Sequence, residues 1–245
     1  MIPSRRAVLL GAAALGLGGS SIACSKPRRV LTSVHGGIDF TELVHKEPDD
    51  SLPLVVAIHG LGGAPEHWIA GWTPFPGRAR IAMPRGFDRH EEGYSWFPWS
   101  GSPTSMKDPK LAADVGAAEE RLWKGIAARA GGRPVILAGY TQGAILSFVM
   151  AARHPEAVVR AFPMVGSCPD ALFPKEKARA APLTAYHGTA DEIFPIQIVR
   201  DAVSAFKQTG NDAVLREYAG VRHTATDQMH TDLNADMLKA LATKI

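Results

Sequence analysis

The stretch that decides the expected fold is residues 135–144, which read VILAGYTQGA. Its first four residues are apolar, as in a strand that is covered on both faces. Gly139 and Gly143 flank Thr141, and glycine is needed where a tight turn brings neighbouring elements against the backbone. Apolar residues then recur at helical spacing: Ile145, Phe148, Val149 and Ala152. The stretch therefore predicts a strand, a sharp turn at Thr141 and a helix.

Similar patterns alternate through the rest of the chain. Segments 30–34 and 38–44 flank two glycines and predict a hairpin. Apolar spacing also predicts helices over 111–126 and 229–241. Buried strands are predicted at 54–58, 80–83, 183–186, 214–218 and 159–165, although Pro163 is awkward in a central strand. The alternation predicts one α/β domain over 25–245, with a mainly parallel, doubly covered sheet.

Composition and charge exclude several classes of protein. Apolar residues make up 46% of the 245 residues, which excludes a disordered chain and a multispan membrane protein. Residues 1–23 contain no Asp or Glu, so removing Arg5 and Arg6 with this segment lowers the net charge from +3 to +1. A net charge of +1 does not indicate a nucleic-acid partner.

The first 24 residues have the pattern of an export signal. A short basic segment over 1–6 precedes an apolar run over 7–19 that is too short to span a bilayer of about 30 Å. Arg5 and Arg6 resemble a twin-arginine signal, and ordinary positive charge before the apolar run is an equal alternative. We expect residues 1–24 to be removed or processed and the protein to be exported, either membrane-anchored or else periplasmic or secreted.

Residues 21–24, SIAC, resemble a bacterial lipobox, in which the cysteine is acylated. Ser21 departs from the leucine that this motif prefers, so an ordinary cleavage site beside Cys24 remains an alternative. One acyl chain binds a membrane only marginally, and stable anchoring takes more than one. A lipidated Cys24 would associate with the membrane and would leave Cys168 as a lone, partly buried thiol.

Three polar residues follow predicted strands in the order that nucleophilic catalysis needs. Thr141 lies in a G-x-T-x-G turn, where the nucleophile elbow has serine. Asp191 ends HGTAD at 187–191, and His223 follows the strand at 214–218. An alcohol needs a base and a group that orients the base. Thr141, Asp191 and His223 are therefore the predicted catalytic residues.

The loop HGLGG at 59–63 ends an earlier strand and resembles a loop that contributes an oxyanion-hole amide. The predicted donors are the main-chain N–H groups of Leu61 and Gln142. Because these are main-chain groups, we expect the side chains at 61 and 142 to be less constrained. His59 and His187 each precede a glycine at a strand end and are interpreted as turn or supporting residues.

From about residue 30 onward the chain resembles the bacterial phospholipase/carboxylesterase group of α/β-hydrolases, which is acyl-protein-thioesterase-like. The resemblance is carried by HGLGG at 59–63, GYTQG at 139–143, HGTAD at 187–191 and the His223 loop. It implies an α/β-hydrolase fold and hydrolysis of a carboxylic ester or thioester, with a small-molecule or lipid-like substrate. It also implies no metal and no organic cofactor. Ala144 replaces the last glycine of the family's elbow.

Threonine at the nucleophile position leaves the level of activity open. A β-branched residue at positive φ carries strain on the order of 1–3 kcal/mol, and its methyl restricts the hydroxyl. An active hydrolase, a weak or substrate-restricted hydrolase, and an inactive surface binding protein are the alternatives. The plausible partners Asp191 and His223 favour activity.

Aromatic residues cluster in the loops expected after the early strands. Trp68, Trp96 and Trp99 are predicted to form a substrate-binding wall, and loop packing is the alternative. Asp88, His90 and Glu92 suit a solvated loop better than a metal site. Residues 167–182 are too few for a large lid domain. The sequence is silent on oligomeric state.

Overall fold

The elbow stretch forms strand β7 (Val135–Tyr140), which lies in the middle of an eight-stranded sheet. It continues into helix α3 (Gln142–Arg153). The structure is a computed structural model and describes residues 28–44, 51–99, 106–175 and 178–242. The predicted signal segment, including Cys24, lies outside these residues. Within them, no helix is long and apolar enough to cross a membrane.

The sheet is mainly parallel, as the sequence predicts. The hairpin of β1 and β2 is antiparallel, β2 is antiparallel to β4, and the remaining neighbours are parallel. Their order across the sheet is β1 (Arg29–His35), β2 (Ile38–Val44), β4 (Arg80–Pro84), β3 (Leu54–Ile58), β7, β8 (Val158–Met164), β9 (Leu183–Gly188) and β10 (Ala213–Tyr218).

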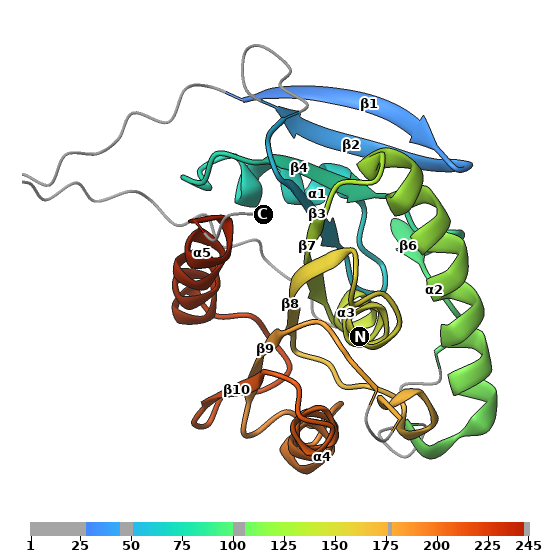
Figure 1. Cartoon of the computed structure of the whole chain (residues 1–245), viewed down its shortest axis with the longest axis vertical. Helices are drawn as coiled ribbons and strands as arrows, with labels where there is room; N and C mark the ends of the chain where they lie inside the picture. The colour runs from blue at the N-terminus through green and yellow to red at the C-terminus, as the bar shows by residue number, and fades with distance from the viewer. Residues whose placement is uncertain (1–27, 45–50, 100–105, 176–177, 243–245) are drawn as a thin grey trace, which may run out of the picture.

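Helices cover both faces of this sheet and give two hydrophobic cores. One core lies under α2 (Pro109–Ala130), α3 and α4 (Ile196–Gln208). The other lies under α1 (Pro65–Trp72) and α5 (Asp227–Ala242). Figure 1 shows α5 and α2 on opposite sides of the strands. The buried strands have apolar residues on both faces because both faces are covered.

Two helices and a small hairpin were not anticipated from the sequence. Helix α1 has eight residues and begins at a proline, so it is too short for a clear helical period. Trp68 therefore lies in a helix and not in a loop. The sequence of helix α4 did carry a signal, since the apolar residues Val199, Val203 and Phe206 recur at helical spacing. These three side chains are buried along one face of the helix. The hairpin pairs β5 (Asp88–His90) with β6 (Gly93–Ser95).

Pro163 lies in the central strand β8, where proline cannot donate a ladder hydrogen bond. The strand accommodates it by pairing poorly on one side. Toward β7 the register runs to Met164, but toward β9 only Ala161 and Met164 are paired. The predicted strand is therefore correct, and the proline interrupts its ladder with β9.

The connection between β8 and β9 contains no large lid domain in the part that the structure describes. Among its described residues, the connection forms a 3₁₀ turn, η2 (Asp170–Leu172). Cys168 lies in this connection and is 1% exposed, so its thiol is fully buried and the prediction of a partly buried thiol is wrong in degree. Burial raises the pKa of its thiol.

Helix α2 packs so closely on the β1–β2 hairpin that a methyl group at Gly125 would collide with it. A Cβ at this position would lie 2.5 Å from Ile38 Cγ1 and 3.0 Å from the His35 carbonyl oxygen. Gly125→Ala is therefore expected to lower the free energy of unfolding by about 1–3 kcal/mol, although alanine favours a helix. Urea unfolding measures the change.

Gly116→Ala is the matched control in the same helix. Its new Cβ would meet only the end of the Arg153 side chain, at 3.3 Å. Helix propensity alone then raises the free energy of unfolding by up to about 1 kcal/mol. Equal stability changes in the two variants would contradict the close packing of Gly125.

Candidate active site

The turn after β7 has the backbone strain that the sequence predicts. Thr141 has φ 48° and ψ −108°, and α3 begins at the next residue. A Cβ on Gly139 would lie 2.0 Å from the Gly143 carbonyl oxygen, and one on Gly143 would lie 2.0 Å from the Ile58 carbonyl oxygen. Both glycines are therefore required, and Thr141 is held half-buried above the strand end.

The hydroxyl of Thr141 lies against Gly60. A Cβ on Gly60 would fall 2.0 Å from Thr141 Oγ1. Within the described part of the chain this hydroxyl makes no hydrogen bond, whether to His223 or to another group. The Thr141 amide donates to the Met164 carbonyl at 3.1 Å, which fixes the backbone but leaves the side chain unattached.

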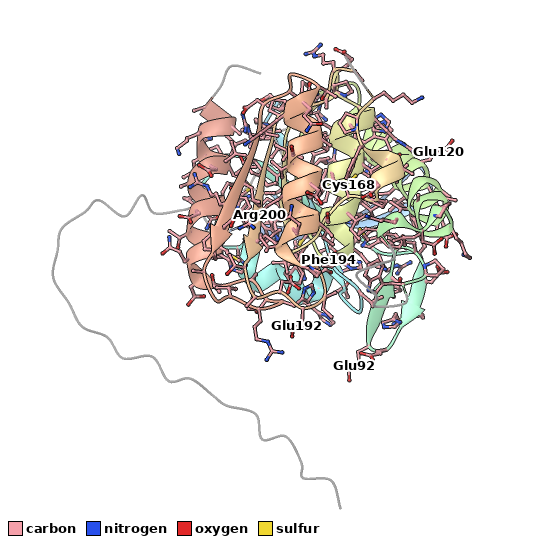
Figure 2. All side chains as sticks on the ribbon, turned by 90° about the horizontal axis from the view of Figure 1, so that it is seen from below. Glu92, Glu120, Cys168, Glu192, Phe194 and Arg200 are labelled. Carbon is pink, nitrogen blue, oxygen red and sulfur yellow. The ribbon has the colours of Figure 1, made fainter. Side chains whose placement is uncertain are left out.

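Asp191 and His223 are brought together after β9 and β10. His223 Nδ1 lies 2.9 Å from Asp191 Oδ2 and 3.1 Å from Oδ1. The carboxylate is buried and also accepts the amides of Ile193 at 2.8 Å and Phe194 at 2.9 Å. The side chain of His223 is 23% exposed. Figure 2 shows Phe194 and Glu192 at the same end of the molecule as Glu92, at the tip of the β5–β6 hairpin.

A second imidazole, that of His187, contacts the same carboxylate. Its Nε2 lies 2.7 Å from the Phe194 carbonyl oxygen and 3.2 Å from Asp191 Oδ2. Both oxygens are acceptors, so Nε2 carries the proton. His187 Nδ1 is buried with no hydrogen-bond partner among the described residues. The sequence indicated a supporting role for His187 but did not place it on Asp191.

These contacts decide the charge of Asp191. Burial raises its pKa, but hydrogen bonds from His187, His223 and the Phe194 amide outweigh burial. The net effect holds the pKa of this carboxyl well below its usual range. An ionised Asp191 accepts the Nδ1 proton of His223, so Nε2 of a neutral His223 is left as a proton acceptor.

His59 orders the loop at 59–63. The Gly86 amide donates to His59 Nε2 at 3.1 Å, so Nδ1 carries the proton and donates to the Gly60 carbonyl at 2.7 Å. The Gly62 amide donates to the main-chain carbonyl of Tyr94 at 2.9 Å. Burial lowers the pKa of His59 to about 4, so this ring stays neutral. Within the described residues the Leu61 amide has no acceptor.

The side chain of Gln142 is firmly held, contrary to expectation. It is buried, its Oε1 accepts the Trp96 amide at 3.0 Å, and its Nε2 donates to the Phe97 carbonyl at 2.8 Å. Its main-chain amide, at the first turn of α3, has no acceptor among the described residues. The sequence missed this role because the partners of Gln142 lie far away in the chain. Leu61, in contrast, is 38% exposed.

The three predicted wall tryptophans do not form one wall. Trp96 is 1% exposed, donates from Nε1 to the His59 carbonyl at 2.8 Å and packs on Phe87. It therefore supports the loop at 59–63, which corrects its interpretation as a substrate contact. Trp99 is half-buried and stacks on Phe194 with ring centroids 5.4 Å apart. Trp68 packs with the core on the other face of the sheet.

The described residues contain no group of three side chains that could hold a metal ion. In the β5–β6 hairpin, the guanidinium carbon of Arg89 lies over the ring of Tyr94, 4.8 Å from its centroid.

The fold and this geometry define an α/β-hydrolase. The phospholipase/carboxylesterase family model matches residues 41–240, and the chain belongs to this family. Among solved structures it is similar to esterase PE8, with 25% identity over 77% of this chain and 92% of that one, and a TM-score of 0.66.

Two more distant solved structures share the fold. Acyl-protein thioesterase 2 of Zea mays is 18% identical over 83% of this chain and 99% of its own, with a TM-score of 0.66. SOBER1 of Arabidopsis thaliana is 21% identical over 77% of this chain and 99% of its own, with a TM-score of 0.66. A search of curated proteins found no match.

The lowered pKa of His59 predicts a loss of stability in weak acid. Between about pH 7 and pH 5 the unfolded chain binds a proton at this residue that the folded chain does not bind. The free energy of unfolding therefore falls by about 2 kcal/mol from this group as the pH falls. Asp191 contributes only at lower pH, because its carboxyl is ionised in both states in this window.

Urea unfolding at the two pH values measures this effect. His59→Gln is expected to lose less stability than the unsubstituted protein between them. His230→Gln, at an exposed histidine in α5 that does not affect the pKa of His59, is the control and should keep the full loss. An equal loss in all three proteins would contradict the assignment.

Proposed function

We propose that this hydrolase cleaves carboxylic esters through an acyl-enzyme on Thr141. The observation that carries the proposal is the Asp191–His223 pair, with Nδ1 2.9 Å from an ionised carboxylate and Nε2 available as a base. The strained position of Thr141 at the elbow supports the choice of nucleophile. Family membership supports the reaction class.

The proposed reaction has two halves. His223 takes the Thr141 proton as Oγ1 attacks the carbonyl carbon, and the Leu61 and Gln142 amides stabilise the oxyanion. The bond to the alcohol then breaks, and His223 returns the proton to the leaving oxygen. Water attacks the acyl-threonine by the same route and releases the acid and Thr141. Asp191 orients His223 throughout.

The position of the Thr141 hydroxyl affects the expected rate. It lies at Gly60 without a hydrogen bond to His223, so the side chain has to turn or be aligned by the substrate before it attacks. The β-branch restricts that rotation. We therefore propose that the protein is a slow hydrolase. The β-branched side chain of Thr141, and not Asp191 or His223, limits the rate of its chemical step.

The test is the hydrolysis of short 4-nitrophenyl esters by variants at position 141. Thr141→Ser is expected to raise kcat/KM about tenfold, a gain of about 1.4 kcal/mol, because it removes the methyl. Thr141→Ala is expected to lower it at least about a thousandfold.

Two results would contradict the proposal. Equal activity of the native protein and Thr141→Ala would exclude Thr141 as the nucleophile. Activity in Thr141→Ser alone would make the native chain a binding protein that retains the site. Thr231→Ala, at an exposed hydroxyl in α5 that donates to the Asp227 carbonyl at 2.9 Å, is the control for general effects of losing a threonine.

We further propose export and lipid attachment through Cys24, on the strength of the sequence motif alone. Arg28, the first described residue, donates to the carbonyls of Gly77 and Ala79, each at 2.8 Å. Arg28 is four positions after Cys24, so a lipidated Cys24 would keep the fold within about 14 Å of its anchor. Mass spectrometry of the mature N-terminus is expected to find an acylated cysteine, and Cys24→Ser should release the protein from membranes. An unmodified Cys24 would contradict this proposal.

A further inference from the structure

A cavity of about 330 Å³ lies between α1 and α5, on the face of the sheet opposite α3. This volume lies within the range of ligand pockets, roughly 300–1,000 Å³. Its walls are mostly aromatic and apolar: Trp68, Trp72, Tyr140, Phe162, Met164 and Leu233. The polar lining groups are His67 and His230, which are exposed, and Asn234, which is half-buried. The cavity is thus apolar inside and polar at its solvent edge.

Tyr140 forms the wall between this cavity and the catalytic histidine. Its ring centroid lies 6.5 Å from that of His223 and 6.2 Å from that of Trp68. Tyr140 directly precedes Thr141, and its cross-strand neighbour Met164 accepts the Thr141 amide. Ala225, in the His223 loop, also lines the cavity. The cavity therefore adjoins both the elbow and the histidine loop.

The reaction assigns different positions to the two halves of an ester. The leaving oxygen receives its proton from His223, so the alcohol half must emerge beside that ring. On the other flank of His223 lies Phe194, with its centroid 5.7 Å away, and Phe194 stacks on the half-buried Trp99. That aromatic pair belongs to the opposite core and offers a separate surface for the acyl half.

We infer that the cavity between α1 and α5 binds the leaving-group half of the substrate, and that this half is a compact aryl or cyclic alcohol or thiol. This inference rests on the proposed function. A fused-ring alcohol could pack against Trp68 and Trp72 in the offset or edge-on contacts that aromatic rings prefer. A small alcohol such as methanol would leave these apolar walls unfilled, so the cavity selects by the size of the alcohol.

Gly71 lies at the exposed edge of the cavity, where a larger side chain can narrow the opening without disturbing the fold. It lines the cavity near the end of α1, and a Cβ built on it meets no atom within 4 Å. Gly71→Leu therefore places a branched apolar side chain in open space. Leucine also favours a helix more than glycine does. The neighbouring Ala70 is exposed and does not line the cavity, so Ala70→Leu is the matched control.

The first experiment measures kcat/KM on 2-naphthyl acetate and on methyl acetate, which differ only in the alcohol. In Gly71→Leu the ratio of the two values is expected to fall at least about tenfold, the scale on which apolar pockets discriminate. In Ala70→Leu the ratio should stay within about twofold. An unchanged ratio in Gly71→Leu, with a changed dependence on acyl length in a 4-nitrophenyl ester series, would show that the cavity takes the acyl half and overturn the inference.

The second experiment does not depend on catalysis. Calorimetric titration with 2-naphthol is expected to give binding to the native protein and to Ala70→Leu, and at least about tenfold weaker binding to Gly71→Leu. Equal affinity in all three proteins would overturn the inference, whatever the ester assay gives. Binding that depends on Gly71, without hydrolysis of any ester, would overturn the proposed function alone and leave the cavity as an aryl-alcohol site.

Discussion

The site depends on a contact between backbones that excludes side chains. Gly139, Gly143 and the carbonyl of Ile58 approach so closely that a Cβ on either glycine would lie 2.0 Å from an oxygen atom. This contact joins the ends of β3 and β7 to the start of α3. It sets Thr141 over Gly60 and leaves two main-chain amides beside it without partners in the described chain. Side chains could not provide the same arrangement, because any atom added there would separate the three segments.

Around this contact, two buried imidazoles hold the two halves of the site. His59 accepts from the Gly86 amide and donates to the Gly60 carbonyl within its own loop, and His187 donates to the acid that orients His223. Gln142 adds a third support, because its amide side chain holds the loop at 95–97. These groups touch no reacting atom in the proposed mechanism. They fix the positions of the groups that do, which is the pre-organisation on which electrostatic catalysis depends.

The sequence predicted the parts of the protein whose cause is local. Apolar runs located the strands of the central sheet, helical spacing located α2, α3 and α5, and glycine spacing located the elbow. Helix α1 was not predicted because eight residues show too little periodicity. Strands β5 and β6 were not predicted because strands of three residues show none. The roles of Gln142, His187 and Trp96 depend on partners that only the fold brings together. An aromatic residue in a loop has the same sequence pattern whether it contacts a ligand or packs on a histidine.

The burial of Cys168 has a consequence for the redox chemistry of the folded chain. Disulfide exchange and oxidation both proceed through the thiolate, and burial disfavours this form. The native fold therefore keeps its thiol inert in oxidising and reducing surroundings alike. Only unfolding exposes the sulfur, so the appearance of a reactive thiol at this position reports the opening of the core around η2 and α4.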